Sequence, residues 1–322
     1  MNSIYSSHFG ILIDDYLKHK QKLGFIYGKQ PGILCQFDKL CRTRFPHENT
    51  LTKDICVAWA TKRTSEGFST FEGRISVLRQ FASYLNQIGE TAFMIPSNWG
   101  HTVPQYIPYI FSESEIAKVW DYMDNLAPIP QSRTRHIVLP AMVRILYCCG
   151  LRPGEARRLK VDDVNLHTGK IYIRESKGHK DRIVMLADDA IDYYRCYNEK
   201  IMRLQPGREW FFPTSKGQEH QYYHLGAAFR TCKADVFVDY TSLNSPRLYD
   251  FRHTFATHRL YCWLREGKDL NAMFPYLSAY MGHAKLSCTY YYIHLVPEQL
   301  KAMSGLDFSK YESLLPEVEC DE

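Results

Sequence analysis

Two arginines lie in segments whose composition suits phosphate binding. Arg152 belongs to GLRPGE (residues 150–155), a sharp turn after an apolar run, and Arg252 belongs to YDFRHTFATH (residues 249–258). A guanidinium group can donate two parallel hydrogen bonds to phosphate oxygens and stays charged at physiological pH. A lone arginine is more often part of a surface salt bridge. Each segment taken alone therefore leaves both interpretations open.

Other residues could complete the chemistry of phosphodiester cleavage. A covalent route needs a nucleophile at phosphorus, cations on the non-bridging oxygens and an acid for the leaving oxygen. Three consecutive tyrosines occupy positions 290–292, and two lysines, at positions 177 and 180, lie in a polar turn. Metal and nucleotide sites are not indicated, because His253 and His258 are five positions apart and neither HExxH nor a glycine-rich phosphate loop occurs. We therefore expect neither a metal nor a cofactor.

Four segments resemble, in this order, the signature segments of the tyrosine recombinase (phage integrase) family. They are GLRPGE, ESKGHKDRIVML (residues 175–186), YDFRHTFATH and MGHAKLSCTYYYIH (residues 281–294). The resemblance covers residues 108–295, and the amino-terminal part looks like the family's core-binding domain. It implies a mainly α-helical fold with a small antiparallel β-sheet, built as a two-domain DNA clamp. It also implies site-specific recombination through a covalent 3′-phosphotyrosyl intermediate.

The resemblance assigns roles to individual residues. Arg152 and Arg252 match the two catalytic arginines, and Glu155 is expected to support the first of them. Lys177 matches a hairpin lysine that protonates the leaving 5′ oxygen; its alternative role is a solvated surface charge. His283 matches the histidine that hydrogen-bonds to the scissile phosphate; its alternative role is to cap a helix end.

The resemblance places the nucleophile at Tyr292. The family separates its last histidine from the tyrosine by nine positions, and Tyr292 lies nine positions after His283. Tyr291 is the alternative. The other two tyrosines of the run are then expected to pack the helix that carries Tyr292 against the domain.

One position departs from the family pattern. The usual His-x-x-Arg box reads YDFR here, so Tyr249 replaces the first histidine. A phenol can donate a hydrogen bond to a phosphate oxygen, but it is a poor base at neutral pH. We expect Tyr249 to be a phosphate ligand and nucleophile activation to be slower. The alternative is that Tyr249 only packs.

Residues 1–98 are predicted to form the helical core-binding domain, residues 99–107 a linker, and residues 108–322 the catalytic domain. Apolar spacing in the first domain predicts one helix that ends near Gly24. It also predicts a second helix that is capped by Ser69 or Thr70 and followed by Gly89. The linker is inferred from prolines and glycine in a stretch without periodicity.

In the second domain, the capping box at residues 112–115 predicts a helix start. Residues 136–149 are apolar enough for a buried helix that Gly150 stops. Residues 170–174 and 182–186 are predicted strands of a hairpin, and residues 210–212 are a candidate third strand. Helices resume at Asp250, and Pro297 is expected to start a tail helix. Its apolar stripe could dock on a neighbouring subunit or pack within the chain.

The charge distribution suits a polyanionic partner. The net charge is +5, but residues 293–322 carry −5, so the rest of the chain carries +10. A basic body favours nucleic acid, although a solvated basic surface is the simpler explanation. No signal-type apolar run and no stretch of eighteen apolar residues occurs, and the ten cysteines lack a framework spacing. We expect a soluble protein in the reducing cytoplasm.

The resemblance implies double-stranded DNA with paired inverted-repeat half-sites as the substrate. It also implies a tetramer on that DNA, formed alone or with a related recombinase. Because the helical domain starts within the first dozen residues, an Xer-like or transposon-type recombinase is favoured over a phage integrase with an arm-binding domain. The alternatives are a topoisomerase-like enzyme and a catalytically inactive DNA-binding relative.

Overall fold

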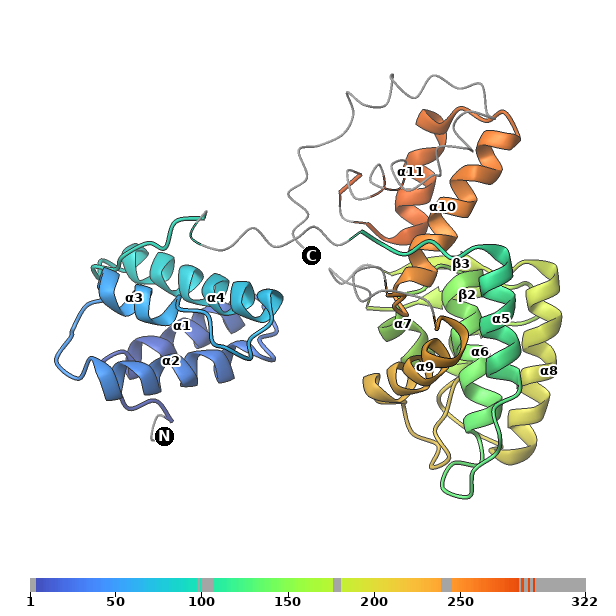
Figure 1. Ribbon diagram of the computed structural model, residues 1–322, viewed down its shortest axis with the longest axis horizontal. Helices are drawn as coiled ribbons and strands as arrows, with labels where there is room; N and C mark the ends of the chain where they lie inside the picture. The colour runs from blue at the N-terminus through green and yellow to red at the C-terminus, as the bar shows by residue number, and fades with distance from the viewer. Residues whose placement is uncertain are drawn as a thin grey trace. The chain divides into compact units, whose positions relative to one another are not determined.

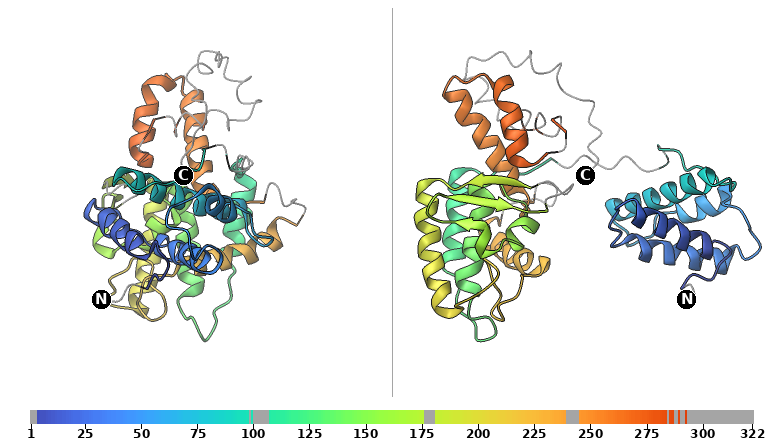
Figure 2. Two further views of the ribbon diagram at one scale, coloured as in Figure 1. Left: turned by 90° about the vertical axis from the view of Figure 1, so that its left-hand side faces the viewer. Right: turned by 180° about the vertical axis from the view of Figure 1, so that it is seen from behind.

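The computed structural model describes residues 4–97, 99, 107–175, 181–238, 245–283, 285, 286, 289 and 292. The chain forms two compact units, residues 1–106 and residues 107–322 (Figures 1 and 2). As predicted, the fold is mainly helical with one small antiparallel sheet. None of the helices in the described part of the chain has the length and hydropathy to cross a membrane.

The first unit packs its helices around an aromatic core. In the described residues these helices are α1 (Gly10–Lys22), α2 (Gln30–Arg44), α3 (Lys53–Trp59) and α4 (Phe68–Gln87). Each contributes buried apolar positions, and the rings of Tyr16, Phe37, Trp59 and Phe81 meet edge to face. Such aromatic contacts bury a large apolar area in a small unit.

The helix α4 begins earlier than predicted. Its N-cap is Gly67, and not Ser69 or Thr70. A buried ion pair explains the difference, because Arg74 donates from Nε and Nη2 to the Glu66 carboxylate at 2.9 Å each. This pair fixes residue 66 against the helix, so the helical conformation starts directly after it.

The second unit is built around the helix α6 (Arg135–Cys148). Its residues are apolar on nearly every side, so it is enclosed by neighbouring helices. It contacts α5, α7, α8, α9 and α10. As predicted, α5 starts with a capping box between Ser112 and Glu115. The surrounding elements are α5 (Glu113–Asp124), α7 (Pro153–Arg157), the 3-10 turn η1 (Val161–Asp163), α8 (Asp188–Leu204), α9 (Tyr222–Val236) and α10 (Asp250–Arg265).

The sheet has the strand order β1-β2-β3 and is antiparallel throughout. The strands are β1 (Val164–Asn165), β2 (Lys170–Ile173) and β3 (Arg182–Met185), so the predicted hairpin is present. The predicted third strand at residues 210–212 is wrong, because β1 takes that place. Trp210 forms only an isolated bridge with Lys160. Phe211 and Phe212 are both buried but lie outside the strands of the sheet.

The helices α10 and α11 (Leu270–Met281) pack side by side, as both views in Figure 2 show. They share an apolar cluster of their own that includes Leu260, Phe274, Leu277 and Tyr292. The helix α11 also contacts β3. The end of α11 therefore lies near the sheet. The predicted tail helix from Pro297 lies outside the described residues.

Candidate active site

The turn between α6 and α7 presents a backbone carbonyl to Arg252. Gly150 has a φ of +59°, in the left-handed region, and its carbonyl accepts a hydrogen bond from Arg252 Nη1 at 2.6 Å. A Cβ atom at this position would lie 2.5 Å from Phe255 Cδ1. Both facts require glycine. The same turn places Arg152 as the N-cap residue of α7.

The Glu155 carboxylate binds two guanidinium groups. Its Oε1 accepts from Arg152 Nη1 and from Arg182 Nη1, both at 2.8 Å, and its Oε2 accepts from Arg182 Nη2 at 2.8 Å. The Arg152 backbone amide also donates to Oε2 at 2.9 Å. Burial opposes ionisation, but the Arg182 hydrogen bonds and charge outweigh it and lower the pKa of Glu155 to about 2. The carboxylate is therefore ionised and orients Arg152.

Arg252 is fully buried at the start of α10. Its Nη2 donates to the carbonyl of Met281, and Arg152 Nη2 donates to the next carbonyl, that of Gly282, at 3.2 Å. The guanidinium groups of Arg252 and Arg152, which come from distant segments, thus bind the carbonyls of two consecutive residues at the end of α11. Burial and then the charge of Arg152 lower the pKa of Arg252. An anion bound between them would relieve this repulsion.

His283 follows the turn that ends α11. Gly282 caps the helix with a φ of +65°, and His283 Nδ1 lies 2.8 Å from Thr289 Oγ1. Burial, followed by the charges of Arg252 and Arg152, lowers the pKa of His283 to about 3. The imidazole is therefore neutral at pH 7 and can share a hydrogen bond with an oxygen atom.

Tyr292 lies against this histidine. Its ring stacks on His283 with the centroids 5.9 Å apart and an interplanar angle of 21°, and the His253 ring is 5.5 Å away. The side chain is 3% exposed, in the cluster between α10 and α11. Its hydroxyl is close enough to Arg252 to affect the pKa of that guanidinium. Tyr290 and Tyr291 lie outside the described residues.

Tyr249 lies directly before α10, on the Arg152 side of the cluster. Its ring centroid is 5.1 Å from that of His253, and its hydroxyl accepts a hydrogen bond from the Arg152 side chain. The phenol therefore contacts Arg152, one of the two arginines predicted to bind the phosphate, and its own role as a phosphate ligand stays a prediction. Tyr249 therefore packs against His253 and also makes a polar contact with Arg152.

The structure thus brings together the predicted residues that it describes: Arg152, Glu155, Tyr249, Arg252, His283 and Tyr292. Lys177 lies outside the described residues. Among the residues that the structure describes, the cluster holds the cations of Arg152, Arg182 and Arg252 with the carboxylate of Glu155. This excess of positive charge next to a phenol suits the binding of a phosphodiester and attack on it.

A sequence profile of the phage integrase family matches residues 111–299, more than half of the chain. The chain belongs to the phage integrase family. One similar protein is the putative integrase/recombinase y4rE of Sinorhizobium fredii, which is 28% identical over 90% of this chain and 92% of its own length. The tyrosine recombinase XerD of Proteus mirabilis is 28% identical over 76% of this chain and 75% of its own length.

Solved structures of other proteins share the fold. The XerH site-specific recombinase, bound to palindromic difH substrate after cleavage, superposes with a TM-score of 0.64 at 18% identity, over 85% of this chain and 77% of that one. The Tn1549 transposon integrase, in complex with transposon right end DNA, gives 0.62 at 13% identity, over 87% and 94%. The fold is therefore that of a core-binding domain joined to a catalytic domain.

Two residues of this cluster, Arg182 and His253, were not predicted from the sequence to belong to the site. Arg182 lies within the signature segment 175–186, yet its type and position alone did not distinguish it from a surface cation. His253 was considered only as a metal ligand. It is buried between Tyr249 and Tyr292, and burial followed by the Arg252 charge lowers its pKa to about 4. Its position directly after Arg252 in the sequence could have indicated that it belongs to the site.

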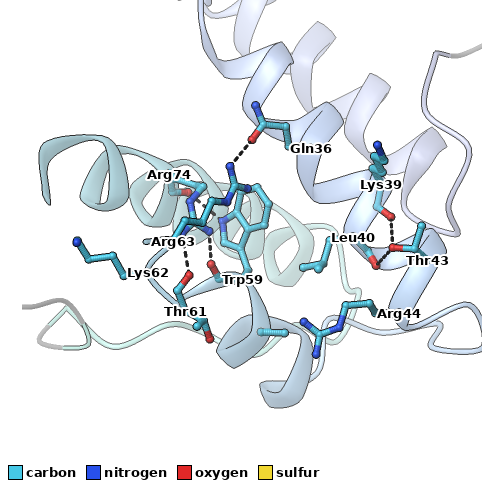
Figure 3. A pocket seen from close by; sticks show the side chains of 11 residues that line it. Gln36, Lys39, Leu40, Thr43, Arg44, Trp59, Thr61, Lys62, Arg63 and Arg74 are labelled. Carbon is cyan, nitrogen blue, oxygen red and sulfur yellow. Dashed lines mark hydrogen bonds between the residues drawn. The ribbon is translucent and has the colours of Figure 1, made fainter. Parts of the chain in front are cut away.

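A second candidate site is a basic pocket in the first unit, with a volume of about 510 Å³ (Figure 3). Arg63 donates to Gln36 at 3.0 Å and lies over the Trp59 ring, and the Arg74 guanidinium also lies over that ring. Arg74 is paired with Glu66, whereas no ion pair occurs at Lys39, Arg44, Lys62 or Arg63 within the described residues. The lining residues are Gln36, Lys39, Leu40, Thr43, Arg44, Ala58, Trp59, Thr61, Lys62, Arg63 and Arg74.

Proposed function

We propose that the chain is a site-specific DNA recombinase that cuts and rejoins DNA through a covalent 3′-phosphotyrosyl intermediate. The observation that supports this most is the meeting of Arg152, Arg252 and Tyr292 around His283, from three segments that are far apart in the sequence. The family membership and the recombinase relatives support the same activity.

The proposed reaction has one displacement and its reversal. The Tyr292 hydroxyl gives its proton to water and its oxygen attacks the scissile phosphorus. The bond to the 5′ oxygen breaks, and Lys177 gives that oxygen a proton. Arg152 and Arg252 bind the non-bridging oxygens, and His283 shares a hydrogen bond with one of them. The 5′ hydroxyl of a partner strand then attacks the phosphotyrosine and releases Tyr292. The phosphodiester energy is kept in the intermediate, so the reaction needs no cofactor.

Two central residues of the proposed mechanism, Arg252 and Tyr292, are buried in the structure. Arg252 is fully buried and Tyr292 is 3% exposed, with the tyrosine ring against His253 and His283. Because Arg252 is fully buried, a phosphodiester can reach its guanidinium group only if neighbouring groups move. We propose that DNA binding drives this movement.

We propose that DNA with paired inverted-repeat half-sites is the substrate, bound by a tetramer in the cytoplasm. Similar folds are known bound to palindromic difH substrate and, for lambda integrase, as a dimer on a COC′ core site. The basic pocket of the first unit supports DNA binding, because its lysines and arginines can bind backbone phosphates.

A covalent adduct on nicked suicide DNA tests the activity. The DNA that flanks the gene supplies the candidate inverted repeats. Wild type should form a protein–DNA adduct, Tyr292→Phe should form none, and Tyr291→Phe is the matched control that should still form it. An adduct in Tyr292→Phe would show that another residue is the nucleophile. Absence of an adduct in wild type on its own site would favour the inactive DNA-binding relative, and relaxation of plasmids that lack the site would favour a topoisomerase.

Salt-dependent DNA binding tests the basic pocket. We expect Lys39→Gln/Lys62→Gln to weaken binding on every DNA sequence. The slope of log affinity against log salt should decrease by about 0.9 for each phosphate that the variant no longer neutralises. Lys18→Gln is the control, because Lys18 is exposed and pairs with Asp15. An unchanged slope in the double variant would exclude the pocket from the DNA interface.

A further inference from the structure

Arg182 connects three parts of the active-site region. It is the first residue of β3, and its side chain is only 8% exposed. Its Nη1 and Nη2 donate to the two Glu155 oxygens at 2.8 Å each, and its Nε donates to the Tyr280 carbonyl at 2.8 Å. One guanidinium therefore joins the sheet, the α7 turn and the end of α11.

The first of these interactions acts on Arg152. The carboxylate that Arg182 holds with two parallel hydrogen bonds is the one that accepts from the Arg152 Nη1 and backbone amide. Such a planar pairing fixes direction as well as distance. Removing Arg182 would take away two of the hydrogen bonds that hold the Glu155 carboxylate, and this would loosen the orientation of Arg152.

The other interactions act on the turn that precedes His283. A Cβ atom at Gly282 would lie 3.2 Å from Arg182 Cδ and Nη1, so the arginine packs directly against this turn. The carbonyls of residues 281 and 282 are the acceptors for Arg252 and Arg152. Arg182 therefore supports the same turn while it holds Glu155.

We propose that Arg182 is a positioning residue that sets Arg152 and the 281–283 turn around one phosphate. The inference rests on the proposed recombinase function and deepens it. A role in stability alone explains the geometry less well. Buried ion pairs often contribute little more to stability than apolar residues of similar volume, whereas this guanidinium uses all three of its donor directions on groups next to Arg152 or Arg252.

The variant Arg182→Lys tests the proposal. Lysine keeps the charge, but it cannot make the two parallel hydrogen bonds with Glu155 and reach the Tyr280 carbonyl together. We expect DNA affinity to change less than about twofold, and single-turnover cleavage at saturating DNA to slow by about tenfold or more, because small misplacements of phosphate ligands are costly. Arg174→Lys is the matched control. It pairs with Asp163 close to the same hairpin, but its side chain is 63% exposed, so its cleavage rate should stay at the wild-type value.

A double-mutant cycle separates positioning from a general structural defect. If Arg182 acts through Arg152, Arg182→Lys should slow cleavage much less in an Arg152→Lys background than in wild type. Should Arg182→Lys fail to fold, Glu155→Asp replaces it in the same cycle and should be similarly non-additive with Arg152→Lys. Effects that multiply independently, or a wild-type rate in Arg182→Lys, would overturn the proposal while the recombinase function stands. A wild-type chain that forms no adduct would remove both.

Discussion

At the scale of single residues, Tyr249 is the position where this chain departs from its family. Its hydroxyl accepts a hydrogen bond from Arg152, and its ring faces His253. A phenol in that place can hold a cation or a phosphate oxygen, but it cannot accept a proton at neutral pH as an imidazole can. Burial keeps both neighbouring histidines neutral, since it lowers the pKa of His253 to about 4 and that of His283 to about 3.

We predict that Tyr249→His speeds cleavage. An imidazole at this position can take the proton of the attacking Tyr292. A positioned base typically contributes about 10²–10⁴-fold, of which a base introduced by substitution is expected to recover only a part. The expected gain is about tenfold in single-turnover adduct formation at pH 7. Tyr249→Phe is the control, and it should lower the rate because it removes the hydrogen bond with Arg152. If the histidine variant is no faster than wild type, proton removal from Tyr292 does not limit cleavage.

At the scale of elements, the site is assembled from helix ends. The turn after α6, the first turn of α10 and the last turn of α11 supply the carbonyls and guanidinium groups, and β3 supplies Arg182. Helix ends leave carbonyls without helical partners, and in this protein arginines satisfy them. The orientation of the arginines therefore depends on the conformation of short turns.

We predict that Gly150→Ala is destabilising and impairs cleavage. The left-handed φ of +59° costs a non-glycine residue about 1–2 kcal/mol, and the new Cβ would lie 2.5 Å from the Phe255 ring. The unfolding free energy should fall by at least about 2 kcal/mol, and the displaced carbonyl should weaken the hold on Arg252. Gly154→Ala is the control, because a Cβ there has nothing within 4 Å. Urea denaturation of both variants measures the difference, and equal stability would contradict the prediction.

The helices and strands could be predicted from the sequence more completely than the side-chain interactions that join them. The capping box before α5, the apolar α6 that ends before Gly150, and the β2–β3 hairpin all follow from local patterns. The role of Arg182 does not, because its hydrogen bonds join residues that are 27 and 98 positions apart. The error at residues 210–212 has the same cause. An aromatic run favours a strand locally, but both phenylalanines are buried by other parts of the chain.

At the scale of the whole molecule, each unit carries groups that make the protein sensitive to a different solution condition. The first unit has a basic pocket in which Lys39, Arg44 and Lys62 form no ion pair within the described residues. The second unit buries ionisable groups, including Glu155, Arg252, His220 and His253. The first arrangement makes DNA binding depend on salt. The second makes folding depend on pH, because a buried group binds protons differently in the folded and unfolded chains.

We predict that the second unit loses stability as the pH falls from about 6.5 to about 4. Burial is the main cause that lowers the pKa of His220 and His253 to about 4 and that of His283 to about 3. Above pH 6.5 these histidines are neutral in both states. Below it, the unfolded chain takes up protons that the folded chain does not, which costs roughly 2 kcal/mol for each histidine between pH 7 and pH 5. Glu155, with a pKa of about 2, acts only at lower pH.

The variant His220→Gln isolates one of these contributions. His220 shares a hydrogen bond with the Pro213 carbonyl at 3.2 Å, and the glutamine amide can donate to the same oxygen without taking up a proton. Urea denaturation at pH 7 and pH 5 should therefore show a pH-dependent loss that is smaller by roughly 2 kcal/mol than in wild type. His167→Gln, at an exposed position, is the matched control and should retain the wild-type loss. If His220→Gln loses as much stability as wild type, His220 does not remain neutral in the folded chain. The acid sensitivity would then come from the other buried histidines, among them His253 and His283, which burial keeps neutral beside Tyr292.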